Sequence, residues 1–561
     1  MDIPAQSQAA TFGYVARQAS IRFSGLAFDK VLGYVFALFV AKTYGSTAFG
    51  LYIFGVGLFE ISYALTEAGF EKASIRAIAS AKARGVSGEI PRIVRTCVAF
   101  TMPLGLAVML VVILAAPWFS GLLGRPDLSP FLQLAAIAIP MSLLADNQLW
   151  AMEGIGRQRY TVIVRMVVEP IVKVTVAAVL FVAMDSVSRS APLAIAYAAG
   201  VGSSALLAWL IYRREVIREI TGTAHEHHLS GLLRVAVPAC GLSLLQRFLS
   251  WASTFIVFTF VTSEATTHYA VAVRTALLTM MVASAFDAAF RPSIAAALAL
   301  DRREDIVEPF QRVARTVLAL VLPAVAMLVA FPHRVMPVVG DQFAVATPVV
   351  AIIALGTLAS FLAGPSATAL TMAGHARVPF WNGLASGGVG VVVSLALVRG
   401  YGMVGVAIGQ LVSMVVANLM HTIAAQRLLG VVAVGRAHIK PVVGVVAAVA
   451  AGYFVDGIAD ANKYVALVEV GAAVVIAYGA ALLIVGLPPD DVRMVRAVVG
   501  KLVAMPLRLP TRGGRRQAPG QRSCRHRRRP PRRGNSARRG AATPDARSCG
   551  CRQRSPRIDL R

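Results

Sequence analysis

The sequence predicts an all-α membrane protein with about 14 transmembrane helices, arranged as two six-helix lobes and two further helices. Hydrophobic residues make up 57% of the 561 residues and charged residues only 15%, with a mean hydropathy of +0.67. A soluble domain would carry about 25% charge. Apolar runs of about 20 residues, the length that crosses a bilayer, recur along most of the chain.

The chain also repeats itself. Several residues recur at a nearly constant spacing. At 220 residues the pairs are Arg95 and Arg315, Thr96 and Thr316, Pro103 and Pro323, Phe70 and Phe290, and Gly154 and Gly374. At 217 residues Tyr269 follows Tyr52. Such a period indicates two copies of one unit. An even number of helices per copy keeps both copies in one orientation, so we expect a pseudo-two-fold axis along the membrane normal.

The expected spans follow from the apolar runs. They lie near 17–42, 48–70, 93–118, 129–152, 160–184, 191–212, 231–261, 267–290, 312–332, 345–373, 379–398, 402–425, 437–455 and 464–487. The first six form an N-terminal lobe over 17–212 and the next six a C-terminal lobe over 231–425. Residues 437–487 add two helices, while 1–16 and 213–230 are expected to be a cytoplasmic N-terminus and a cytoplasmic linker.

Lysine and arginine in the loops set the expected orientation. Loops after even-numbered spans hold 19 of these residues and loops after odd-numbered spans hold six. Cytoplasmic loops carry the excess of positive charge, so both termini are expected inside.

The C-terminal tail explains much of the net charge of +27. Residues 508–561 hold 18 arginines against two aspartates, a net charge of +16, and almost no apolar residues. Such a segment cannot bury a core, so we expect it to be disordered. It either attracts anionic lipid head groups or nucleic acid, or it is an arginine-rich out-of-frame extension of a GC-rich gene. We favour the extension and expect no nucleic-acid partner. The five cysteines show no metal-ligand spacing, so we expect no metal, cofactor or disulfide.

Charged residues inside the expected spans carry most of the functional information. A charge at bilayer depth costs at least about 2.5–3.5 kcal/mol, so it faces protein or water. Asp29 and Lys30 lie in the first span and align, at an offset of 217, with Gln246 and Arg247 in the seventh. We expect Lys30 and Arg247 to face each other across the central axis. Arg247 has no acid within a helical turn, which favours contact with a ligand.

Other intramembrane charges allow two interpretations. Arg165, Glu169 and Lys173 are spaced four and four, so they share one helix face. They either line a wet cavity for an anionic group or form ion pairs, such as Asp29 with Arg22 and Glu169 with Lys173. The candidate binding residues are Lys30, Arg247, Arg165, Lys173 and Arg274, and the candidate ion-coupling residues are Asp29, Glu60, Glu67 and Glu169.

Four stretches resemble a known family. The segments AKTYGSTAFGLYIFGVGLFEI and FEKASIRAIASAKARG, and later AMEGIGRQRY and TMAGHARVPF, are similar to bacterial polysaccharide biosynthesis proteins. These are oligosaccharide-lipid flippases of the O-antigen type, within the multidrug/oligosaccharidyl-lipid/polysaccharide exporter superfamily. The resemblance covers residues 10–487.

The resemblance implies a transporter that flips a polyprenyl-diphosphate-linked oligosaccharide across the inner membrane. It implies alternating access of a central cavity in which cations, here Lys30 and Arg247 by position, bind the diphosphate. Lipopolysaccharide or exopolysaccharide synthesis is the expected setting, with membrane lipids, a polysaccharide polymerase and glycosyltransferases as partners. Asp29 beside Lys30 departs from a purely basic pattern.

Three alternatives stay open. A multidrug exporter of the same fold would need unpaired acids at mid-depth, and Asp29 keeps that alternative alive. A membrane glycosyltransferase or polymerase would need acid or metal chemistry in a sizeable loop, whereas the outer loops are short. A transport-inactive partner in a synthesis complex is the third. We therefore predict a transporter rather than an enzyme.

Overall fold

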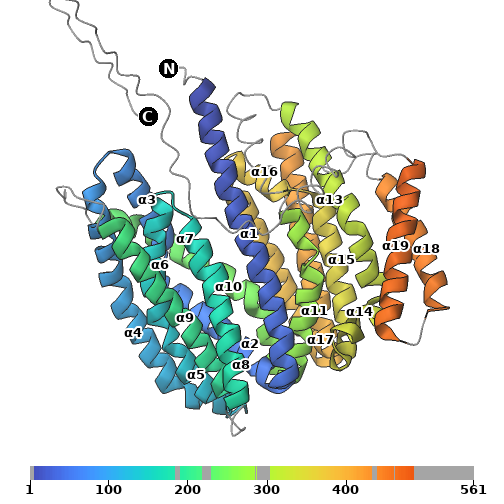
Figure 1. The fold of residues 1–561 in the computed structure, drawn as a ribbon, viewed down its shortest axis with the longest axis horizontal. Coiled ribbons are helices and arrows are strands. Elements are labelled where there is room, and N and C mark those ends of the chain that lie inside the picture. Colours follow the sequence, from blue (N-terminus) through green and yellow to red (C-terminus); the bar gives the residue numbers. More distant parts are fainter. Residues whose placement is uncertain are drawn as a thin grey trace, which may run out of the picture. The chain divides into compact units, whose positions relative to one another are not determined.

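A computed structural model describes residues 5–183, 190–217, 229–284, 286, 304–431, 439–459 and 462–485. In these ranges every regular element is a helix, which confirms the predicted all-α class (Figure 1). All described residues belong to the first of the chain's two compact units, Met1–Gly500. The predicted arginine-rich tail 508–561 and most of the linker 213–230 lie outside the described residues.

The N-terminal half forms helices close to the expected spans. They are α1 (Ala5–Thr43), α2 (Ser46–Glu67), α3 (Phe70–Ala83), η1 (Ser87–Glu89), α4 (Ile90–Leu122), α5 (Leu128–Ala136), α6 (Ala138–Gly154), α7 (Arg159–Thr161), η2 (Val162–Val168), α8 (Glu169–Ala183), α9 (Ala191–Tyr212) and η3 (Arg213–Ile217). The segment 1–16, expected outside the first helix, is helical from Ala5 onward. Its alanines and glutamines favour a helix whether or not they lie in lipid.

The C-terminal half follows the same plan. Its elements are α10 (Leu229–Phe260), α11 (Ser263–Leu277), α13 (Glu304–Ala330), α14 (Pro332–Val339), η4 (Asp341–Ala346), α15 (Thr347–Ala363), α16 (Ser366–Met372), α17 (Arg377–Leu429), α18 (Ile439–Asp456) and α19 (Lys463–Val485). α17 covers two predicted spans and breaks at Gly402, where φ is 54° and ψ is −134°. Ten helical segments of the described residues are long and apolar enough to cross a membrane. The chain is therefore a multi-pass membrane protein.

The glycine turn that follows α6 in one half and α16 in the other fixes the register of the repeat. Gly156 and Gly374 both have a left-handed φ, 83° and 86°. The next backbone amide donates five residues back in each case, from Arg157 to Met152 at 2.7 Å and from His375 to Leu370 at 2.9 Å. Gly374 therefore corresponds to Gly156 at an offset of 218, rather than to Gly154 as the sequence comparison suggested. Only glycine adopts this conformation readily, which explains its place in both turns.

α2 positions the charged residues because it packs against elements of both halves. It contacts α5 and α6 on one side and α10 and α11 on the other. A Cβ on Gly57 would lie 2.6 Å from the Trp251 ring, so glycine permits the close approach of α10. Tyr52 of α2 stands edge-on to the rings of Phe36, Phe131 and Tyr197. This aromatic packing forms the wall beside which the charged residues lie.

Candidate functional site

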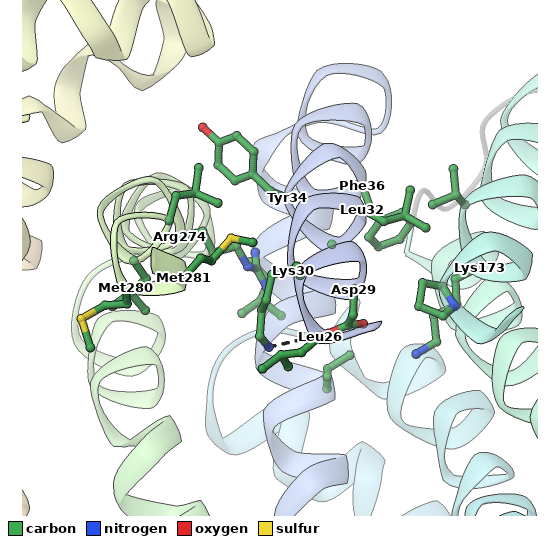
Figure 2. A pocket seen from close by; sticks show the side chains of 18 of the residues that line it. Leu26, Asp29, Lys30, Leu32, Tyr34, Phe36, Lys173, Arg274, Met280 and Met281 are labelled. Atoms are coloured by element: carbon green, nitrogen blue, oxygen red, sulfur yellow. Dashed lines mark ion pairs between the residues drawn. The ribbon is translucent and has the colours of Figure 1, made fainter. Parts of the chain in front are cut away.

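Two cavities among the described residues have several charged side chains in their lining. The larger of the two has a volume of about 520 Å³ and is lined by α1, α2, α8, α10 and residues in and after α11. Three cations, Lys30, Lys173 and Arg274, and one carboxylate, Asp29, line it. Figure 2 shows Lys30, Arg274 and Lys173 around this cavity, with Asp29 between Lys30 and Lys173 in this view. Most other lining side chains are apolar. The cavity therefore presents an excess of two positive charges.

Lys30 keeps most of its ammonium group available. Its Nζ lies 3.7 Å from Asp29 Oδ2, beyond hydrogen-bond distance, and 61% of its side chain is exposed. Asp29 thus pairs loosely with its neighbour in sequence, whereas we expected Arg22 as its partner. The ion-pair interpretation holds for Asp29 only weakly, and Lys30 can still accept an anion.

Arg274 has a buried hydrogen-bond donor without a protein partner. Its Nη1 finds no acceptor within the described residues. The guanidinium carbon lies 5.6 Å from the centre of the Phe49 ring, which supports the cation from one face. A buried N–H group without an acceptor is costly, so this position favours a ligand or water that accepts from it.

A second cavity of about 300 Å³ adjoins the first and shares Tyr52, Val56 and Lys173 with it. Its charged lining is balanced, with three cations and three carboxylates. These are Arg165, Lys173 and Arg247 against Glu60, Asp146 and Glu169. Glu67 does not line either of these two cavities.

The prediction that Arg247 lacks an acidic partner is wrong. Its Nη1 is hydrogen-bonded to Glu60 Oε2, and its Nη2 lies 3.6 Å from Glu67 Oε2. The guanidinium also lies 5.7 Å from the centre of the Tyr63 ring. Both acids come from α2, so spacing along α10 could not reveal them. Arg247 lines the second cavity and Lys30 the first, so the cations that share a cavity with Lys30 are Arg274 and Lys173.

The predicted face of Arg165, Glu169 and Lys173 is present and fully paired. Arg165 donates to Asp146 Oδ1 from Nε at 2.8 Å and to Glu169 Oε2 from Nη1 at 2.7 Å. Lys173 Nζ donates to Glu169 Oε1 at 2.6 Å and lies 4.4 Å from the centre of the Tyr197 ring. This confirms the expected ion pair between Glu169 and Lys173.

Three further residues join this network and were not among the candidates, namely Tyr63, Asp146 and Ser204. Tyr63 donates its hydroxyl to Asp146 Oδ2, and Ser204 donates to Glu169 Oε2 at 2.8 Å. Each lies on a different helix from its partner. Asp146 was visible as a charge in an apolar run, but its partners were not. Tyr63 lies three residues after Glu60, so one face of α2 serves both sets of ion pairs.

Two family models match the sequence. Residues 15–297 match the model described as polysaccharide biosynthesis protein, and residues 238–396 match that of MatE. No protein of curated function matches the chain.

Solved structures share the fold at low identity. An inward-facing multidrug resistance MATE family transporter of the MOP superfamily has 13% identity and a TM-score of 0.61, with 72% of this chain and 94% of that chain covered. The lipid II flippase MurJ in an inward closed conformation has 12% identity and a TM-score of 0.65, with 86% and 100% covered. A Vibrio cholerae MATE transporter has 15% identity and a TM-score of 0.54, with 74% and 97% covered.

Proposed function

Because the chain belongs to the polysaccharide biosynthesis protein family, we propose that it flips a polyprenyl-diphosphate-linked oligosaccharide across the cytoplasmic membrane. The observation that carries this proposal is the cationic cavity of 520 Å³, in which Lys30 pairs only loosely with Asp29 and Arg274 Nη1 has no acceptor among the described residues. The family match supports the sugar-linked substrate class. The shared fold of a lipid II flippase and multidrug transporters supports transport.

The physical task is to move a diphosphate through about 30 Å of hydrocarbon. Arginine presents a fork of N–H donors that matches phosphate oxygens, and charge-assisted hydrogen bonds of this kind are the strong ones. Because Arg274 Nη1 has no acceptor among the residues that the structure describes, binding there breaks no ion pair of these residues. Lys30 adds a second cation whose only close carboxylate is 3.7 Å away.

The balanced second cavity supports a different role. Its cations are already held by Glu60, Asp146 and Glu169, so a phosphate would have to displace a carboxylate. We therefore place the diphosphate at Lys30 and Arg274, and we assign Arg247, Arg165 and Lys173 to the ion-pair network beside it. The pair between Arg247 and Glu60 joins α10 to α2, so a movement that separates these helices would have to break it.

Among the candidate ion-coupling residues, Asp29 fits that role best. It lines the cationic cavity, and its partner lies beyond hydrogen-bond distance. Glu169 accepts hydrogen bonds from Arg165, Lys173 and Ser204. Glu60 and Glu67 both lie within ion-pair distance of Arg247. An inside-negative potential would also favour outward movement of the anionic head, by about 2.3 kcal/mol per charge per 100 mV. We place both termini in the cytoplasm and a polymerase and glycosyltransferases among the partners.

Reconstituted protein tests the proposal directly. Proteoliposomes holding a fluorescent polyprenyl-diphosphate-linked sugar would report flipping as loss of fluorescence to an impermeant quencher. We expect Arg274→Gln to abolish flipping and Arg274→Lys to retain part of it, since lysine keeps the charge without the fork. Arg399→Gln, which removes an exposed cation outside both cavities, is the matched control.

Three results would contradict the proposal. Flipping by Arg274→Gln at the rate of the unsubstituted protein would show that the cavity cation is not required. Equal losses in Arg274→Gln and Arg399→Gln would show a general effect of charge. Export of a cationic dye, without flipping of the lipid-linked sugar, would instead identify a multidrug exporter.

A further inference from the structure

A third cavity, of about 490 Å³, lies between α10 and α17 and differs from the other two in chemistry. None of its 14 lining residues is charged. The polar side chains are Gln246, Ser250 and Ser253 of α10 and Gln410 and Ser413 of α17. The volume falls in the range of about 300–1,000 Å³ typical of small-molecule sites.

The repeat shows how this cavity arises. At the offset of 218 fixed by the Gly156 and Gly374 turns, Arg165, Glu169 and Lys173 correspond to Gly383, Gly387 and Val391. In the N-terminal half these positions carry the ion-paired side chains that line the second cavity. In the C-terminal half, two of them carry no side chain and the third carries a small apolar one. The equivalent face of α17 is therefore hollow.

Glycine is responsible for much of the open space. A Cβ on Gly383 would meet no atom within 4 Å, so a side chain there would extend into the cavity. A Cβ on Gly387 would approach Leu249 Cδ1 to 2.9 Å, so the wall is tighter at that point. Along the first part of α17 the lining runs from Pro379 to Val391, which is roughly 18 Å along the helix.

Several polar side chains of the cavity have hydrogen-bonding groups without a partner among the described residues. Ser253 Oγ donates to Gln410 Oε1 at 3.0 Å, which leaves the amide nitrogen of Gln410 free to donate. The side-chain amide of Gln246 has no hydrogen-bond partner within the described residues. Uncharged amides and hydroxyls at membrane depth are costly when unpaired, so they favour a polar occupant.

We infer that this cavity binds sugar residues of the transported lipid, an inference that rests on the proposed function. Amides and hydroxyls match the uncharged hydroxyls of a sugar, and the absence of charge in the lining disfavours a phosphate or a cationic drug. Phe380 provides an apolar surface for a sugar ring. Ser250 lines this cavity and its neighbour Trp251 lines the cationic one, so α10 contributes to the lining of both.

Two lipid probes separate this inference from the proposed function. Affinity is measured in nanodiscs for polyprenyl diphosphate and for the same lipid carrying a disaccharide. We expect the disaccharide to raise the affinity by about 10-fold or more, as a few net hydrogen bonds would. We expect Gly383→Leu, which fills the cavity, to remove this gain and leave the affinity for polyprenyl diphosphate unchanged.

Gly388→Leu is the matched control. A Cβ on Gly388 also meets no atom within 4 Å, but this residue does not line the cavity, so the disaccharide gain should persist. Gln246→Leu is a second test in case Gly383→Leu does not fold. It removes an amide without filling the cavity, and we expect it to reduce the affinity gain from the disaccharide.

The outcomes are distinct. A gain that survives in both Gly383→Leu and Gln246→Leu, or is absent from the unsubstituted protein, overturns the sugar site and leaves the proposed function standing. Failure of the unsubstituted protein to bind either lipid overturns the proposed function itself.

Discussion

Replacement of Glu169 by glutamine tests whether the ion-pair network stabilises the N-terminal half. Glu169 accepts from Arg165, Lys173 and Ser204, and its side chain is only 10% exposed. Glutamine has nearly the same shape but no charge. Arg165 would keep Asp146, whereas Lys173 would keep an uncharged amide oxygen and its contact with the Tyr197 ring, but no carboxylate within 4 Å among the described residues.

The expected loss is large because a buried cation loses its only carboxylate. Breaking a buried pair by removing one partner costs roughly 3–5 kcal/mol. Lys173 is 18% exposed and Arg165 stays paired, so we expect the lower end, about 3 kcal/mol. Removing both charges in Glu169→Gln/Lys173→Met should restore most of the stability, since an apolar replacement of a buried pair is often neutral.

Thermal unfolding in detergent measures the effect. It is monitored by the reaction of a maleimide dye with the buried thiol of Cys97, in protein whose other four cysteines are replaced by serine. Glu264→Gln is the control, because the Glu264 side chain is 60% exposed and lies 3.9 Å from its His268 partner. We expect that control to unfold as the unsubstituted protein does. If Glu169→Gln unfolds at the same temperature as Glu264→Gln, or if the double variant is as unstable as the single one, the network does not stabilise the fold as argued.

Two further predictions concern α10 and α17. Arg247→Ala should lower both stability and flipping, because Glu60 and Glu67 lose their cation. Arg247→Lys should recover part of each. A stable, fully active alanine variant would contradict this prediction. Gly402→Ala should destabilise the protein by about 1–3 kcal/mol, because φ of 54° with ψ of −134° suits glycine alone. In the same thermal assay Gly400→Ala should be neutral, since a Cβ there meets no atom within 4 Å, and equal effects would refute the argument.

Much of the fold could be predicted because its signals are local in the sequence. Apolar runs locate the helices, and every predicted span overlaps at least one helix of the structure. The start of α1 was missed because residues 5–16 are too polar to resemble a span, yet they form a helix. The break at Gly402 was found only as a gap between two spans, since hydropathy carries no information on dihedral angles.

The candidate site was less predictable because its partners come from different helices. Spacing of four residues correctly placed Arg165, Glu169 and Lys173 together, since all three lie along a single helical segment. The acids that hold Arg247 lie on α2, 187 and 180 residues away in sequence, and no periodicity links them. The hollow beside α17 was also missed, because it arises from absent side chains.

The matching glycine turns indicate a repeated backbone, but the side chains at equivalent positions of the two copies differ. At equivalent positions one copy carries a set of ion-paired side chains, and the other carries an open cavity. We therefore expect the two copies to differ in stiffness, with the amino-terminal copy moving as a solid piece and the carboxy-terminal copy bending. A symmetric scaffold of this kind would yield an asymmetric working cycle.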